Sequence, residues 1–443
     1  MRNIKKLRLI AVIIILMLIF ELFSFAFFSD NYNSLYWNSD ISSIIEKGEN
    51  ADMIFVGTSR IYQGISPETI ENELGVKNVC DAASAQQDIK GRYYLLKDML
   101  DYFTPRYVVL EAGMNSLKDE EIVAARRTTM DRIRSLGNKL FFFRDDFKAG
   151  ELLAFLPSYR FLKGESLEEL TSKLTRRMKY FERKGRPEAV GSEEGRVEYY
   201  VRNGFITDLA GKGGEWNFHL SVSMDEINDD QLLYYQKMID LCREKEIPVL
   251  MISVSLPRRQ LYDADNYMGA YDFYKDIADK NDIFYANMNF HKEIGAILKD
   301  TDFADDLHLN GEGAVIESRA YAELIRLYES GADTSELFYE DLDDMAEDID
   351  SIISVNARME FNSRTDNYSL TIESAQPDKL TPEYRYQFID RDSDEIVEES
   401  DYSDMTEYTI EKSKSDLKKL KLRAYARTKG SSADYECMSE LEF

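Results

Sequence analysis

Histidine and cysteine are scarce in this chain, and the shortage limits the chemistry that it can perform. Of its 443 residues, three are histidines and three are cysteines. Cys80, Cys242 and Cys437 lie far apart, so their spacing matches neither a metal site nor a disulfide framework. Their odd number leaves at least one without a partner in the chain, and none lies where a bacterial lipid anchor would need it. We therefore expect no metal and no other cofactor.

Positive charge is also in short supply. The chain has 55 lysines and arginines against 82 aspartates and glutamates, which gives a net charge of -27. A polyanionic surface repels phosphates, so the composition argues against nucleic acid as a partner.

The N-terminus combines basic residues with a long apolar stretch. Leu9 to Phe28 has about the length that crosses a bilayer, and four basic residues precede it. Since basic flanks stay in the cytoplasm, residues 1–30 are predicted to be a single-pass anchor, with the rest of the chain outside the cell. The alternative is a cleaved signal peptide, with Ser24 and Ala26 as its cleavage pattern. Glu21 either marks a short, tilted helix end or meets a polar group on a membrane partner.

After the anchor, residues 31–50 have the pattern of a juxtamembrane stalk, with Tyr36 and Trp37 at the level of the lipid headgroups. In residues 51–332, apolar runs alternate with amphipathic segments. This alternation predicts a flavodoxin-like, doubly wound α/β domain whose five-stranded parallel sheet carries its ligand site at the strands' carboxyl ends. The expected strands are one at Phe55 and others at 76–81, 107–111, 248–254 and 283–288.

Two regions depart from this alternation. Residues 119–227, mixed in charge and rich in aromatics, are predicted to be a largely helical insertion that caps the site. After an acidic linker at 333–354, repeated short alternating runs in residues 355–443 predict a β-sandwich of the immunoglobulin or fibronectin type. The basic residues of the insertion form either a solvated helix face or a groove for an anionic polymer. They are Arg126, Arg127, Arg132, Arg134, Lys173, Arg176, Arg177 and Lys179.

One apolar run ends in Gly57 and Thr58 and then Ser59, which predicts a strand that delivers a hydroxyl into a turn. A rigid strand end with backbone N–H groups just beyond it suits a nucleophile and its oxyanion. His308 is the best candidate for its base, because Asp305 precedes it by three residues and can reach Nδ1 while Nε2 points to the serine. Of the other histidines, His219 is interpreted as a packed or surface residue, and His291 is expected to start a helix after a strand.

These residues resemble motif blocks of the SGNH/GDSL hydrolase superfamily. Gly57–Ser59 is similar to the nucleophile block, Gly113–Asn115 to the Gly-x-Asn block and Asp305–His308 to the Asp-x-x-His block. The chain looks most like membrane-anchored, extracytoplasmic members, including the D-alanyl-transfer protein of lipoteichoic acid synthesis and the alginate O-acetylation proteins. The resemblance implies a serine acyl-enzyme that moves or removes acyl groups on surface polymers, beside a membrane-bound O-acyltransferase.

Two positions depart from the family's pattern. The second block, residues 81–87, has no glycine to supply an oxyanion N–H. Gln86 aligns with that position, and a slip of one residue would place Ala85 there; either backbone N–H can donate, without glycine's freedom of φ. Arg60, which follows the serine, either steers an anionic substrate or forms a structural salt bridge.

The predicted function is an extracytoplasmic serine esterase or O-acyltransferase acting on acyl esters of a cell-surface polysaccharide or polymer. Ser59 is the nucleophile, His308 the general base and then acid, and Asp305 the group that orients it. The resemblance places the Ser59 N–H, the Gln86 N–H and the Asn115 side chain around the oxyanion. Water as acceptor gives hydrolysis and a sugar hydroxyl gives transfer. The alternative is a non-catalytic assembly or polymer-binding protein on the same scaffold.

Overall fold

The computed structural model describes residues 11–21, 32–113, 123–147, 171, 188–193, 196–208, 227–362, 367–412 and 414–442. Residues 11–21 are helical. Within the described ranges, no helix is both long enough and apolar enough to cross a membrane. The predicted span from Leu9 to Phe28 extends beyond the described residues at both of its ends.

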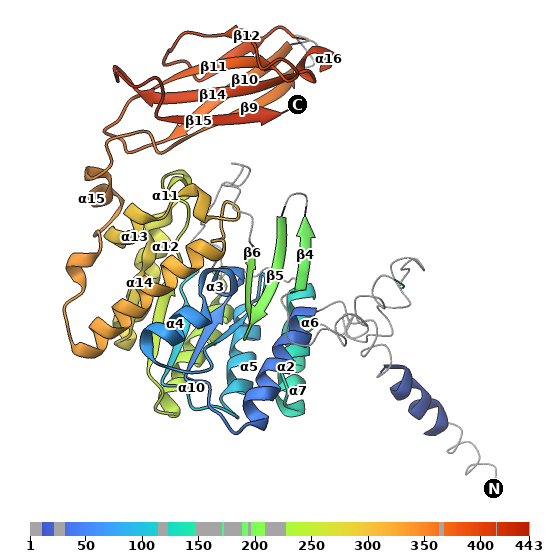
Figure 1. Ribbon diagram of the computed structural model, residues 1–443. Helices are drawn as coiled ribbons and strands as arrows, with labels where there is room; N and C mark the ends of the chain where they lie inside the picture. The colour runs from blue at the N-terminus through green and yellow to red at the C-terminus, as the bar shows by residue number, and fades with distance from the viewer. Residues whose placement is uncertain are drawn as a thin grey trace.

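A five-stranded parallel sheet forms the centre of the first domain (Figure 1). Its strands are β1 (Met53–Gly57), β2 (Cys80–Ala83), β3 (Tyr107–Glu111), β7 (Val249–Ser253) and β8 (Phe284–Asn287). The order β2-β1-β3-β7-β8, with every neighbouring pair parallel, is the flavodoxin-like order and confirms the predicted α/β fold. The second strand begins later than predicted, because Asn78 adopts a left-handed φ of 52° that interrupts the extended chain.

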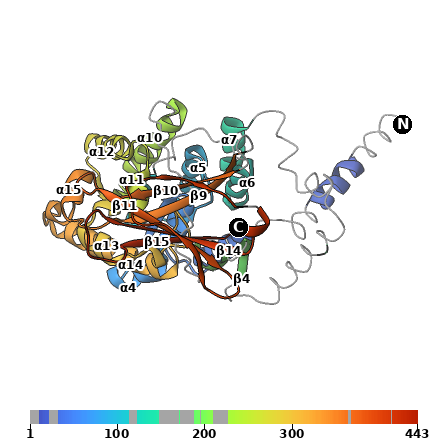
Figure 2. The ribbon, with the colours of Figure 1, turned by 90° about the horizontal axis from the view of Figure 1, so that it is seen from above.

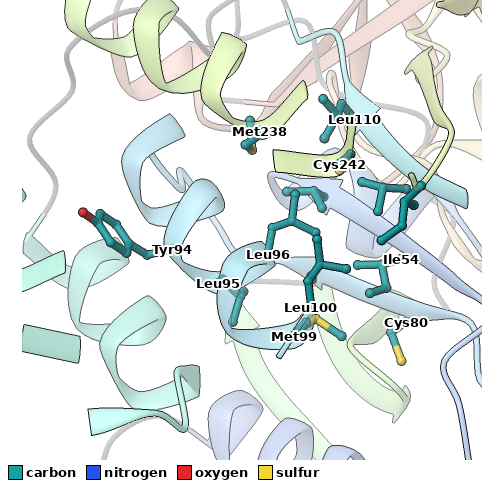
Figure 3. Packing of buried hydrophobic residues seen from close by; sticks show 14 of the residues in the cluster. Ile54, Cys80, Tyr94, Leu95, Leu96, Met99, Leu100, Leu110, Met238 and Cys242 are labelled. Carbon is teal, nitrogen blue, oxygen red and sulfur yellow. The ribbon is translucent and has the colours of Figure 1, made fainter. Parts of the chain in front are cut away.

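Helices cover both faces of this sheet. One face packs against α2 (Tyr32–Glu46), α5 (Ile89–Met99), α7 (Leu136–Asp146), α10 (Asp229–Glu244) and α12 (Tyr267–Asn281). The other face packs against α3 (Ser59–Gly64), α4 (Pro67–Leu74), α13 (Lys292–Ile297) and α14 (Gly311–Ser330). Figure 3 shows Leu96 of α5, Met238 and Cys242 of α10 and Ile54 of β1 in the first of these cores. The strands are near-continuous apolar runs because both faces are buried.

Helix α2 belongs to the body of the protein. Trp37 is only 1% exposed and lies in the same core as Ile41 and Ile44. The ring of Tyr36 stacks on that of Tyr200, with 5.0 Å between the ring centroids. The predicted placement of Trp37 at the level of lipid headgroups is therefore wrong, since the protein core covers its ring, whereas Tyr36 is half-buried against Tyr200.

The described part of the insertion contains strands as well as helices. It comprises α6 (Val123–Arg132), α7, and an antiparallel sheet of β4 (Glu188–Glu193), β5 (Arg196–Arg202) and β6 (Phe205–Asp208). The described part thus contains predicted helices and, in addition, a small sheet that the sequence analysis did not predict. Asn203 and Gly204 have φ values of 49° and 99°, and two successive positive φ values suit a tight hairpin turn between β5 and β6.

This hairpin turn packs on the edge of the parallel sheet. The Asp81 N–H of β2 donates to the Asn203 carbonyl at 2.8 Å, and the Asn203 side-chain amide donates to the Val79 carbonyl at 3.0 Å. A Cβ on Gly204 would lie 2.2 Å from the Asp81 carbonyl oxygen, so this close approach requires glycine. The insertion thereby covers an otherwise open edge strand.

Two of the insertion's arginines are buried, contrary to the prediction of a solvated helix face. Arg126 is 4% exposed and pairs with Asp146 at 3.0 Å. Arg132 is 1% exposed, donates to the Ala83 carbonyl and lies over the Trp37 ring at 5.5 Å from its centroid. They are buried because α6 packs against α2 and α5. Lys173, Arg176, Arg177 and Lys179 lie outside the described residues.

The acidic linker contains η5 (Ser335–Leu337) and α15 (Leu342–Glu347), and leads into two antiparallel sheets around one apolar core. One sheet has the order β13-β10-β9 and the other β12-β11-β14-β15. Their strands are β9 (Ser354–Asn362), β10 (Asn367–Ala375), β11 (Pro382–Asp390), β12 (Ile396–Glu399), β13 (Glu407–Ile410), β14 (Leu420–Thr428) and β15 (Cys437–Glu442). This is the predicted sandwich architecture.

The sandwich lies at the end of the α/β body at which the parallel strands finish. Helix α11 (Arg258–Asp263), which follows β7, contacts β10. Figure 1 shows the sandwich strands above the end that carries α11 and α13, and Figure 2, seen from above, shows them in front of these helices. Ligand sites of doubly wound sheets occur at this carboxyl end.

Candidate active site

Ser59 is the first residue of α3 and comes two residues after the last residue of β1. Thr58 is the N-cap of α3, and its side chain accepts from the Arg60 N–H at 3.4 Å. The strand must end in glycine, because a Cβ on Gly57 would lie 2.3 Å from Ile61 Cγ1 and 2.8 Å from Glu111 Cβ. Local packing therefore accounts for the glycine, and helix capping for the threonine, of this turn.

His308 contacts both Ser59 and Asp305. Its Nε2 lies 2.8 Å from Ser59 Oγ, and its Nδ1 lies 2.8 Å from each Asp305 carboxylate oxygen. Asp305 Oδ1 also accepts the backbone N–H groups of Leu307 and His308, both at 2.8 Å. With the proton on Nδ1 and facing the carboxylate, Nε2 is the acceptor for the serine hydroxyl.

A short pairing between chain segments holds the loop that carries the histidine. The Ala304 N–H donates to the His308 carbonyl at 2.8 Å, and Phe303 and Leu309 form an antiparallel bridge. Asn310 then caps α14 by accepting from the Gly313 N–H at 3.0 Å. The His308 side chain is 16% exposed, so the imidazole is accessible from solvent while the loop sets its position.

The predicted oxyanion residues are only partly described. The Gln87 N–H donates to the Ser84 carbonyl at 3.2 Å, which closes a turn directly after β2. Gln86 is exposed and has a left-handed φ of 51°, whereas Ala85 is not among the described residues with positive φ. Of the two candidates, Gln86 is therefore the one in a conformation that favours glycine. Asn115 lies outside the described residues.

Arg60 turns back into the protein. Its guanidinium donates to the carbonyl of Val254, just beyond the end of β7. Nearby, the fully buried Glu317 carboxylate accepts from the Ser255 N–H at 3.0 Å and from the Ser255 hydroxyl at 2.6 Å. Burial raises the pKa of Glu317 to about 7, against the opposing effects of the Ser255 hydrogen bonds and the Arg60 charge. A role for Arg60 towards substrate remains a prediction.

Glu111 is a buried residue of the site that the sequence pattern did not single out. This carboxylate is the last residue of β3 and 1% exposed, and it accepts from the Thr58 N–H at 2.6 Å and from the Thr58 hydroxyl at 2.8 Å. Arg92 of α5 lies against it, with 3.4 Å between Nη1 and Oε2. A glutamate at the end of an otherwise apolar run was the only signal in the sequence.

The remaining candidates for chemistry are buried or undescribed. His291 caps α13 through an Nδ1 that accepts from the Ile294 N–H at 3.3 Å, and burial lowers its pKa. Burial raises the pKa of the Cys242 thiol to about 12, which disfavours a reactive thiolate. His219 lies outside the described residues. Within the described part of the chain, no group of histidine, cysteine, aspartate and glutamate side chains is arranged to hold a metal ion.

Comparison with known proteins gives solved structures alone, since no family model and no curated protein matches the chain. The chain is similar to a GDSL-like lipase from Bacteroides thetaiotaomicron, with 9% identity over 67% of this chain and 99% of that one, and a TM-score of 0.30. An acylhydrolase from Bacteroides fragilis gives 9% identity over 65% and 97%, with a TM-score of 0.29. A two-domain esterase active on acetylated mannans gives 12% identity over 92% and 95%, with a TM-score of 0.28. At these values the likeness carries no argument about the chemistry of this chain, which rests on its own residues.

Proposed function

We propose that this protein is a serine esterase of the SGNH type, with Ser59, His308 and Asp305 as its catalytic triad. The observation that carries the proposal is the continuous hydrogen-bond chain from Ser59 Oγ through His308 to Asp305, with 2.8 Å at each link. A nucleophile, its base and the group that orients the base are thereby in contact and in the order that acyl transfer needs.

In the acylation step, Ser59 Oγ attacks the ester carbonyl while its proton passes to His308 Nε2. Asp305 stabilises the imidazolium through Nδ1–H. The negative charge that develops on the carbonyl oxygen would be stabilised by the Ser59 and Gln86 backbone N–H groups. Asn115, the third predicted donor, lies outside the described residues. Collapse of this intermediate breaks the ester C–O bond, and the departing alcohol takes the proton from Nε2.

The second step releases the acyl group from Ser59. His308 removes a proton from water, the hydroxide attacks the acyl carbonyl, and the carboxylic acid leaves as Ser59 regains its proton. If a sugar hydroxyl replaces water, the same steps transfer the acyl group to that hydroxyl. The protein would then be an O-acyltransferase supplied by a membrane-bound O-acyltransferase partner.

We propose an acylated cell-surface polysaccharide or polymer as the substrate and the outer side of the cell membrane as the place of action. The support for the location is the basic tip followed by the apolar stretch Leu9–Phe28. The apolar side chains from Val12 to Phe20 are between 39% and 63% exposed, as expected of a segment that the protein body does not cover. The N-terminus would lie in the cytoplasm and the two domains outside.

A fluorophosphonate probe tests the proposal, because it labels serines activated by a base. We expect labelling of the wild type and none of Ser59→Ala. Ser135→Ala is a matched control, since Ser135 also stands at the start of a helix but contacts no histidine in the described contacts. Absence of labelling in wild-type protein that melts cooperatively would favour the non-catalytic polymer-binding alternative.

A further inference from the structure

We propose that the buried Arg92–Glu111 pair is a brace that fixes the oxyanion turn at residues 84–87 relative to the nucleophile turn at residues 57–59. This inference rests on the proposed function. The side chains of Arg92 and Glu111 are each 1% exposed, and they come from α5 and β3. Neither is in the triad, and the pair lies between the two turns rather than in contact with solvent.

Glu111 holds the nucleophile turn at two atoms. Its Oε2 accepts the Thr58 N–H at 2.6 Å and its Oε1 accepts the Thr58 hydroxyl at 2.8 Å. The same carboxylate packs against the preceding residue so closely that a Cβ on Gly57 would lie 2.7 Å from Oε2. The backbone immediately before Ser59 therefore cannot move without moving this carboxylate.

Arg92 connects that carboxylate to the oxyanion turn. Its Nη1 lies 3.4 Å from Glu111 Oε2, and its Nε donates to the Gln87 carbonyl at 3.1 Å. Gln87 closes the turn that carries Gln86, and its side chain donates to Thr129 Oγ1 at 2.9 Å. One guanidinium thus contacts both the group that holds Ser59 and the residue after Gln86.

The brace is needed because the sheet stops short of the site. The pairing of β1 with β2 ends at Gly57 and Ala83, so no strand pairing joins the two turns beyond them. Donors of an oxyanion hole must converge on one oxygen at about 2.7–3.1 Å, and small displacements are costly in rate. A buried ion pair adds little stability over apolar residues of similar size, which favours a positioning role here.

The variants Glu111→Gln and Arg92→Lys test whether the pair positions the two turns or only stabilises the fold. The glutamine oxygen still accepts the Thr58 N–H, while the charge that attracts Arg92 is lost. Lysine retains the charge but lacks the planar fork that reaches Glu111 and Gln87 together. The control is Glu383→Gln, the same isosteric change in the partly exposed Arg427–Glu383 ion pair of the sandwich.

The first measurement is hydrogen exchange by mass spectrometry on the full chain. In Glu111→Gln, the Gln87 amide, which donates to the Ser84 carbonyl, should exchange about tenfold faster because the turn is held less tightly and opens more often. The Thr58 amide should also exchange faster, because a neutral amide oxygen accepts its hydrogen bond more weakly than a carboxylate does. Arg92→Lys should have the same effect on Gln87, and Glu383→Gln none. Unchanged exchange at Gln87 in both brace variants would overturn the proposal, whether or not the protein hydrolyses esters.

The second measurement is the steady-state hydrolysis of p-nitrophenyl acetate. We expect kcat to fall about 10²–10³-fold in both brace variants, as for loss of one oxyanion donor, with KM within about threefold. An active enzyme whose variants exchange faster at Gln87 but retain kcat would show a structural pair and refute the positioning role. A wild type without esterase activity contradicts the proposed function instead, and the exchange result then decides about the brace alone.

Discussion

The α/β body and the C-terminal sandwich bury different kinds of side chain. Among the residues that the structure describes, the body buries charged groups near the carboxyl end of its sheet, including Arg92, Glu111 and Glu317. In the described part of the sandwich, the buried polar residues are Ser354 and Gln387, both uncharged. The sandwich instead has a core of aliphatic and aromatic side chains shared by its two sheets.

This difference distinguishes side chains that stabilise the fold from side chains that position a turn. Burying a charge costs free energy, and pairing it only offsets that cost, whereas burying an apolar side chain stabilises the fold outright. The described core of the sandwich buries apolar side chains and no charged ones. The body, in contrast, buries carboxylates beside Thr58 and Ser255, at the ends of strands β1 and β7, where these side chains hold turns in place.

The largest effect should come from the body, as a loss of rate without a loss of stability. In Asp305→Asn, the amide oxygen can still accept the backbone N–H groups of Leu307 and His308, but its NH₂ faces Nδ1. That contact favours the tautomer with its proton on Nε2, which cannot accept from Ser59, so we expect kcat to fall about 10⁴-fold. Ester hydrolysis and thermal melting of the same sample check this, and a variant retaining a tenth of the activity would contradict the triad.

The opposite result should come from the sandwich, as a loss of stability without a loss of rate. Leu422 of β14 is fully buried, and Leu422→Ala leaves a cavity that should cost about 2–5 kcal/mol of unfolding free energy. Urea unfolding followed by circular dichroism measures this loss. Activity per folded molecule should stay within about twofold, and a large drop in kcat would mean that the sandwich contributes to the site.

The buried carboxyl of Glu317 should make the stability of the body depend on pH. Its pKa rises from 4.5 to about 7 on burial, so between these values the folded state holds a proton that the unfolded chain has released. The contribution of this group to stability therefore falls as pH rises through that window, by about 3 kcal/mol, and is constant above it. The free energy of unfolding, measured in urea at pH 5 and pH 8, should therefore fall less between these two pH values in Glu317→Gln than in wild type. An identical decline in both proteins would contradict the assignment.

The smallest effect should come from Gln86. Because its φ is 51°, glycine relieves strain in the folded turn but gains freedom in the unfolded chain, so Gln86→Gly should change stability by less than about 1 kcal/mol. The donor proposed for the oxyanion is the backbone N–H of Gln86, which glycine retains, so kcat should stay within about threefold of wild type. A much larger loss of kcat would assign the Gln86 side chain a direct part in stabilising the transition state.

Local sequence patterns were enough to predict those parts of the protein whose contacts are local. Apolar runs located the parallel strands, because a strand buried on both faces can carry few polar side chains. Ser66, Pro67 and Gly75 bound α4 as their capping preferences predict. The contact between Asp305 and His308 was also predictable, since three residues of loop bring these side chains together whatever the rest of the fold.

Whether a side chain faces lipid, solvent or the protein core, in contrast, could not be predicted from its own segment of sequence. The aromatic residues of α2 suit a lipid interface and a protein core equally, because both bury rings, and it is the body that covers Trp37. Arg126 and Arg132 look like surface residues until α6 packs on its neighbours. The β5–β6 hairpin depends on finding the open edge of β2, a contact between segments more than a hundred residues apart.

By itself, the sequence predicted the doubly wound fold, the two-sheet C-terminal domain, and Ser59, His308 and Asp305 as a candidate triad. Only the tertiary structure placed Ser59 within 2.8 Å of His308 Nε2 and set Arg92 and Glu111 between the turns that follow β1 and β2. Hydrophobic periodicity predicts which residues are buried, but it does not predict which buried charged side chains contact one another. Those pairings follow from the order β2-β1-β3 of the sheet, which brings the ends of three separate strands to one place.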